Sequence, residues 1–255
     1  SSPILMPETF AAALATEGLL FLAVGAFLAG IVRGFTGFGT AMVFMPIAAQ
    51  FLGPFEALTA MLVMDLVAPL MHVPRALRDG QPKDVVRLGV GALLAVPLGV
   101  FLLTLVQPET FRWGVSVTSF VLLVLLISGV RYRGVLTRKL IYIAGGFGGF
   151  FAGSVGLPGP PVIMLYMAST LPVSAVRANL MLYLILADLI LVGVLWAGGL
   201  LVFAALAAGA LMILPYLAGN WGGAALFRPQ AEKMYRWVAY IIIACAAISG
   251  LPIWD

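Results

Sequence analysis

The sequence predicts an all-α fold, a polytopic bundle of transmembrane helices. Hydrophobic residues make up 63% of the 255 positions and charged residues only 9%, and the mean hydropathy is +1.13. A chain that faces lipid must satisfy every backbone N–H and C=O internally, so only helices and closed barrels span a bilayer. The apolar runs are long and continuous rather than alternating at every second residue, which favours helices over barrel strands.

Ten apolar segments follow one another along the chain, and each is expected to be helical. They lie near residues 17–32, 40–52, 57–73, 85–106, 113–130, 140–152, 160–171, 178–197, 200–225 and 237–252. Several approach the length of about 20 residues that crosses a bilayer, but 40–52, 140–152 and 160–171 are too short. Each short segment borders a Gly/Pro-rich break, either GFTGFG at 34–39 or GSVGLPGPP at 153–161. We therefore expect half-helices or re-entrant hairpins at these two places.

The basic residues predict how the chain is oriented. If successive segments cross in turn from an outer N-terminus, all but one of the basic residues fall on one face, and that face is cytoplasmic by the positive-inside rule. Arg112 alone falls on the other face. The residues on the cytoplasmic face are Arg33, Arg75, Arg78, Lys83, Arg87, Arg131, Arg133, Arg138, Lys139, Arg177, Arg228, Lys233 and Arg236. Both termini are then extracytoplasmic, and the net charge of +4 reflects loops at a membrane rather than binding to nucleic acid.

The two halves of the chain resemble each other. GALLAVP at 91–97 matches GALMILP at 209–215, FRW at 111–113 matches YRW at 235–237, and ISG occurs at 127–129 and 248–250. Together with the two breaks, these matches in the same order predict two repeats of five segments each, residues 1–133 and 134–255. Because five is odd, the second repeat enters the membrane from the opposite side and the repeats are inverted.

Inverted repeats with interrupted helices are typical of secondary transporters, which hold their substrate near the bilayer midplane where the broken helices meet. The glycines have an alternative explanation, because small residues four positions apart also allow close helix packing. Gly30 and Gly34, Gly149 and Gly153, and Gly219 and Gly223 all have that spacing. Prolines at 158, 160 and 161 favour a true break, since proline lacks an N–H donor and bends a helix.

The doubled architecture and the two signatures, GFTGFGTAMVFMP at 34–46 and GSVGLPGPPVIM at 153–164, resemble the TauE/SafE sulfite exporter family over nearly the whole chain. The second signature departs from the family pattern, because it carries three prolines where a more glycine-rich form is common. The resemblance implies a bacterial inner-membrane permease that exports a small sulfur-containing anion such as sulfite or a sulfonate. It also implies seven or eight full spans, so some of the ten segments would be half-helices.

An anion at the midplane needs positive potential, which the N-termini of helices after the breaks supply through free N–H groups and the helix dipole. Arg33 precedes the first break and could grip an oxyanion through two parallel hydrogen bonds, or it could simply anchor its helix at the cytoplasmic edge. Arg177 and Asn179 are secondary candidates: Arg177 suits edge anchoring, and Asn179 suits either a helix–helix bond or a cavity lining. The predicted substrate-binding residues are Arg33, Gly34, Thr36, Gly37, Gly39, Thr40, Ser154, Gly156 and Gly159.

One aspartate lies inside an apolar segment of each half, Asp65 and Asp188. Carboxylates at membrane depth can relay protons and couple transport to a gradient. They could equally bond a neighbouring helix, or pair with Arg33 and Arg177. These alternatives stay open on the sequence alone.

Two other classes of function compete with a carrier. A passive anion channel also uses broken helices. An intramembrane enzyme built on Asp65 and Asp188 is less favoured, since the chain lacks HExxH, GxSxG and Asp-rich motifs. With one histidine and one cysteine, neither a metal centre nor a cofactor is expected, and no catalytic residue is assigned. The expected partners are the anion, membrane lipid and a coupling proton, with the oligomeric state open.

Overall fold

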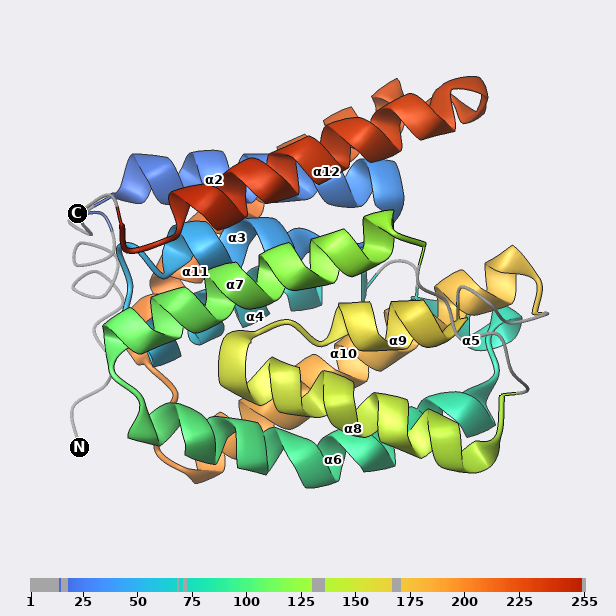
Figure 1. Ribbon diagram of the computed structural model, residues 1–255, viewed down its shortest axis with the longest axis horizontal. Helices are drawn as coiled ribbons and strands as arrows, with labels where there is room; N and C mark the ends of the chain where they lie inside the picture. The colour runs from blue at the N-terminus through green and yellow to red at the C-terminus, as the bar shows by residue number, and fades with distance from the viewer. Residues whose placement is uncertain are drawn as a thin grey trace. The chain divides into compact units, whose positions relative to one another are not determined.

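The computed structural model describes residues 14, 18–67, 69–70, 73–129, 136–166 and 171–253. Within these ranges the chain forms eleven α-helices and no strand (Figure 1), which confirms the all-α prediction. The helices are α2 (Leu19–Thr36), α3 (Thr40–Ala48), α4 (Pro54–Val67), α5 (Val73–Asp79), α6 (Pro82–Leu105), α7 (Pro108–Ile127), α8 (Arg138–Val155), α9 (Gly159–Tyr166), α10 (Val173–Ala197), α11 (Phe203–Leu226) and α12 (Glu232–Ser249).

Five of these helices are long and apolar enough to cross a membrane: α2, α6, α7, α11 and residues Ser174–Ala197 of α10. The helices that follow the two breaks, α3 and α9, have only 9 and 8 residues. At 1.5 Å per residue they reach about 13 Å, less than half of the hydrocarbon core of about 30 Å. They are therefore half-helices, as their sequence length predicts.

The segment near 57–73 differs from its expectation of one continuous helix. The structure places α4 up to Val67 and a separate short helix, α5, from Val73. Pro69 lies two residues after the end of α4. Proline lacks the N–H for an intrahelical bond and its ring clashes with the preceding turn, so the helix ends ahead of it.

The chain divides into two compact units that interleave in sequence. Unit 1 comprises Ser1–Val67, Gln107–Phe120 and Leu200–Asp255, and unit 2 comprises Ala68–Val106 and Val121–Gly199. Each unit therefore takes helices from both predicted repeats. The repeats themselves, 1–133 and 134–255, and their inverted orientation stay a prediction.

In unit 1, α2 and α3 form an antiparallel hairpin. The ring of Phe21, at the start of α2, stacks on Phe51 just past the end of α3, with ring centroids 5.4 Å apart. At the other end of the hairpin, Gly39 lies against the Val32 side chain. The chain thus reverses direction at the break and returns beside α2.

A glycine-lined crossing joins α2 to α11 in the same unit. Gly30 lies against the backbone of Tyr216 and Asn220, and Gly34 lies against the backbone of Asn220 and Ala224. The later glycine of α2 contacts the later residues of α11, so α2 and α11 run parallel. A side chain at either glycine would overlap backbone atoms, and glycine is therefore required for this close approach.

Unit 2 repeats this arrangement with α8 and α6. Gly91 of α6 lies against Tyr142 and Gly146 of α8, and Gly153 of α8 lies against Val96 and Val100 of α6. These helices also run parallel. In each unit, the helix that precedes a break thus packs against a long helix that contains a proline: α11 with Pro215 in unit 1, and α6 with Pro97 in unit 2.

Substitution of Gly219 tests the crossing in unit 1. A Cβ on Gly219 would overlap the Phe27 carbonyl of α2, whereas a Cβ on Gly222 of the same helix would meet nothing within 4 Å. We expect Gly219→Val to cost about 2 kcal/mol, which lowers the melting temperature in detergent by roughly 4–8 °C. Gly222→Val is the matched control and should melt like the wild type; equal melting of the two variants would contradict the packing.

Candidate functional site

The break between α2 and α3 consists of three residues shaped by two glycines. Gly37 caps α2 with φ +80°, and its N–H donates to the Arg33 carbonyl at 2.7 Å. Gly39 precedes α3 with φ +94°. Side chains at these left-handed positions would be strained, so glycine allows the sharp reversal.

Four polar side chains meet beside this break, all within unit 1. Nη1 of Arg33 donates to Oδ1 of Asp65 at 2.5 Å and to Oγ1 of Thr40 at 3.3 Å. Oγ1 of Thr40 is in turn hydrogen-bonded to the Tyr216 hydroxyl at 3.1 Å. We call Arg33, Thr40, Asp65 and Tyr216 the polar cluster. It joins four helices, α2, α3, α4 and α11.

The polar cluster is buried. The side chains of Arg33 and Asp65 are 10% and 6% exposed, and Thr40 and Tyr216 are 2% and 0% exposed. Tyr216 lies thirteen residues after Phe203, the first residue of the 24-residue α11. The cluster is therefore attached near the middle of a helix long enough to span the bilayer.

The electrostatics of the polar cluster favour an added negative charge. Arg33 contributes one positive charge and Asp65 one negative charge, so the ion pair alone is neutral. Thr40 begins α3, whose first N–H groups have no intrahelical acceptor, and the helix dipole places roughly half a positive charge there. The sum is positive, so an anion that displaced Asp65 from Arg33 would find donors from both the guanidinium and the start of α3.

Two residues predicted as binding residues at this break already have structural partners. The Thr36 hydroxyl donates within the break, to the Val32 or Phe38 carbonyl, each at 2.8 Å, so its one proton is in use. Gly34 packs against α11. Both residues thus have a structural role beside the break, and a direct contact of either with substrate stays a prediction.

The break in unit 2, between α8 and α9, offers fewer free hydrogen-bond donors than the break in unit 1. Gly156 has φ +75° and its N–H caps α8 through the Ala152 carbonyl at 3.1 Å. The Ser154 hydroxyl donates back to the Phe150 carbonyl at 2.8 Å. Gly159 begins α9, but prolines follow it at 160 and 161. Two of the first three N–H groups of α9 are therefore missing, unlike those of α3.

The remaining predicted residues lie on α10. Asp188 is 1% exposed, and Arg177 is exposed. The two are eleven positions apart on one helix, or about 16 Å along its axis, which excludes the Asp188–Arg177 pair. Oδ1 of Asn179 accepts a hydrogen bond from the Gln81 N–H at 2.6 Å, so Asn179 bonds to the start of α6, one of its two predicted roles.

Tyr216 was absent from the residues predicted for this site. Its hydroxyl stands within the apolar segment 200–225, directly after Pro215. The sequence does contain a signal that could have identified this residue. Tyrosine is common in the interfacial belts of membrane proteins, whereas Tyr216 lies in the middle of a predicted span. The sequence left the Arg33–Asp65 pair as one of several alternatives, and the structure selects it.

Removal of the Tyr216 hydroxyl should weaken the polar cluster modestly. Tyr216→Phe deletes one buried hydrogen bond worth about 1 kcal/mol, and the melting temperature should fall by roughly 2–4 °C. Tyr142→Phe is the control, because Tyr142 is 42% exposed. Equal melting of both variants would show that the Thr40–Tyr216 bond contributes nothing to stability.

The comparison with known families matches the chain, over residues 22–250, to the model described as Sulfite exporter TauE/SafE. No curated protein and no solved structure matches the chain. The matched region contains α3–α12 completely, with both breaks and the polar cluster. Its apolar helices make the chain an integral membrane protein. The chain therefore belongs to the TauE/SafE sulfite exporter family, a family of membrane transporters.

Proposed function

We propose that this protein is a secondary transporter that exports a small sulfur-containing anion, such as sulfite or a sulfonate, across the bacterial cytoplasmic membrane. The family match supports the class of substrate, and the distribution of basic residues supports an orientation with both termini extracytoplasmic. The single observation that carries the proposal is the buried Arg33–Asp65 pair at the start of a half-helix. A buried charge in a membrane protein is costly and is a functional site by default.

In the proposed mechanism the anion binds by exchange with Asp65. The two share one partner, the Arg33 guanidinium, which can hold an oxyanion through parallel hydrogen bonds. Thr40 and the first N–H groups of α3 complete the site. Gly37 is exposed, with nothing within 4 Å of the position of a Cβ, and Gly39 allows the backbone to come close to the ligand. Tyr216 positions Thr40.

Proton coupling follows from the same exchange. A proton on Asp65 neutralises the carboxylate and releases Arg33 for the anion, so proton and anion bind together. Net export then requires an outward gradient of the anion that exceeds the inward gradient of protons. Two titratable side chains of the described residues take part: Asp65 is bonded to Arg33, and Tyr216 is bonded to Thr40. We assign Asp188, a buried aspartate of unit 2, as a second coupling carboxylate, with Ser154, Gly156 and Gly159 as a weaker substrate subsite.

The ion pair also bears on the rival functions. An aspartic enzyme shares a proton between two carboxylates, whereas Asp65 is bonded to the Arg33 guanidinium. An anion channel is the second outcome to be tested, because a positive constriction would also conduct.

Flux into proteoliposomes tests the proposal. Purified protein should accumulate sulfite or a sulfonate with saturable kinetics, driven by a pH gradient and abolished by its collapse. Current that grows linearly with voltage and without saturation would instead identify a channel. Arg75→Gln is a suitable control, because the Arg75 side chain is 86% exposed and its loss should leave flux unchanged. Failure to transport any sulfur-containing anion would refute the proposal.

A further inference from the structure

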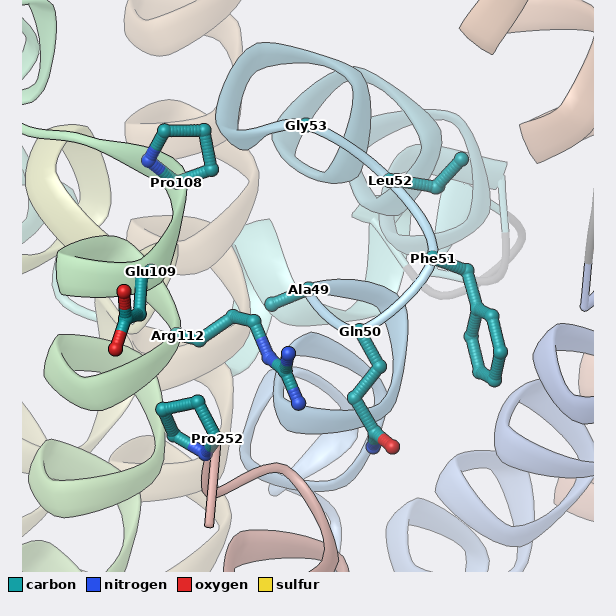
Figure 2. A pocket seen from close by; sticks show the side chains of 9 residues that line it. All are labelled: Ala49, Gln50, Phe51, Leu52, Gly53, Pro108, Glu109, Arg112 and Pro252. Carbon is teal, nitrogen blue, oxygen red and sulfur yellow. The ribbon is translucent and has the colours of Figure 1, made fainter. Parts of the chain in front are cut away.

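The two ends of unit 1 differ in their charge. At the end predicted to be extracytoplasmic, Arg112 and Glu109 both line an open pocket of about 530 Å³ that follows α3 (Figure 2), so a cation and an anion balance there. At the other end the chain turns from α11 into α12, and we call residues 226–237 the α11–α12 corner. Three basic residues and one acidic residue give this corner a net charge of +2: Arg228, Lys233, Arg236 and Glu232.

Two of the three cations in the α11–α12 corner are available to a partner. Arg236 forms an ion pair with Glu232, one turn away on α12. Arg228 and Lys233 are exposed, and neither forms an ion pair within the part of the chain that the structure describes. Only five positions separate them, and both belong to the face that the positive-inside rule predicts to be cytoplasmic.

Exposed apolar side chains accompany these cations. Met234 and Trp237 are 55% and 56% exposed and lie one turn apart on α12. In Figure 1 the start of α12 extends past the end of α2. Basic residues beside exposed apolar ones are typical of a helix at the boundary between lipid headgroups and acyl chains, and tryptophan is enriched at that depth. The corner therefore suits a partner that has both an acidic group and an apolar tail.

Aromatic contacts hold the α11–α12 corner in place. The ring of Tyr235 lies against Phe227, with centroids 5.6 Å apart, and against Phe35 of α2, with centroids 4.9 Å apart. The Tyr235 hydroxyl donates to the Leu226 carbonyl at the end of α11. The corner is thus attached to both neighbouring helices, and a ligand that binds there loses little free energy to ordering the protein.

We propose that the α11–α12 corner is a binding site for an acidic phospholipid. Arg228 and Lys233 attract the phosphate of the headgroup, since basic residues close to an anionic membrane surface each favour binding. The acyl chains lie along Met234 and Trp237. Because Tyr235 attaches the corner to the end of α2, the bound lipid also stabilises unit 1. This inference does not depend on the identity of the transported anion.

Thermal unfolding of the purified full-length chain in a neutral detergent tests this site. Dioctanoyl phosphatidylglycerol should raise the melting temperature in proportion to its affinity for the folded protein. Arg228→Gln/Lys233→Gln should weaken the apparent affinity about 30-fold, the effect expected of two basic residues at an anionic surface, and Arg228→Lys/Lys233→Arg should preserve it. Dioctanoyl phosphatidylcholine has the same chains without a net charge, and equal stabilisation by this lipid would overturn the proposal.

The matched control is Arg138→Gln/Lys139→Gln, which removes two exposed basic residues from the start of α8 and should leave the affinity for phosphatidylglycerol unchanged. An equal loss in both double variants would show diffuse attraction to a positive protein and overturn the site. Glycerol 3-phosphate should stabilise weakly, because it has no acyl chains; stabilisation as strong as that by the lipid would identify a site for soluble phosphates instead. Lipid binding by a protein that transports no sulfur-containing anion would support this inference and refute the proposed function.

Discussion

Arg33→Gln is expected to abolish anion transport, with a loss of more than about 100-fold in flux at subsaturating substrate. The substitution removes the cation that we propose holds the anion, and it leaves the Asp65 carboxylate buried without its guanidinium. Truncation of one partner of a buried ion pair typically costs about 3–5 kcal/mol. The variant should therefore also melt at a lower temperature, and flux in proteoliposomes and melting in detergent should be measured on the same preparation.

The double variant Arg33→Gln/Asp65→Asn separates folding from function. Two neutral amides can hydrogen-bond without a buried charge, so the melting temperature should return toward that of the wild type. Transport should stay absent, because no cation remains in the polar cluster. Recovery of transport in the double variant would show that Arg33 only neutralises Asp65 and does not bind substrate.

Asp65→Asn is expected to remove the pH dependence of anion binding. In the proposed mechanism, ionised Asp65 competes with the anion for Arg33, and protonated Asp65 does not. Apparent affinity for the anion should therefore rise as the pH falls, by at most tenfold per pH unit when one proton binds with one anion. In Asp65→Asn the competing carboxylate is absent at every pH, so affinity should stay near the acid limit of the wild type and uphill transport driven by a pH gradient should be lost.

This measurement uses a sulfonate as the substrate. Sulfonates stay ionised over the pH range of the experiment, whereas the charge of sulfite itself changes with pH. Asp79→Asn provides the control: Asp79 pairs with the exposed Arg75 at 3.5 Å, and its loss removes a carboxylate outside the polar cluster. A pH profile of Asp65→Asn that follows the wild type would exclude Asp65 as the coupling group.

The sequence alone determined the class of the molecule and its elements. Mean hydropathy and continuous apolar runs predict membrane helices because lipid offers no hydrogen bonds to the backbone. Helices α3 and α9 were predictable as half-helices because the breaks and the short apolar runs beside them are local features. Residues such as Gly37 and Gly39 could be recognised for the same reason, since a left-handed turn depends mainly on the residue that makes it.

Only the tertiary structure decided which of these residues act together. Arg33 and Asp65 are separated by 32 positions, and Thr40 and Tyr216 by 176, so no local pattern links them. The same holds for Gly34 and Gly219, whose helix partners lie far along the chain. Local physical rules fix whether a segment is helical and where it turns, but a charge in a membrane is balanced by whichever helix packs beside it. That pairing depends on the whole bundle.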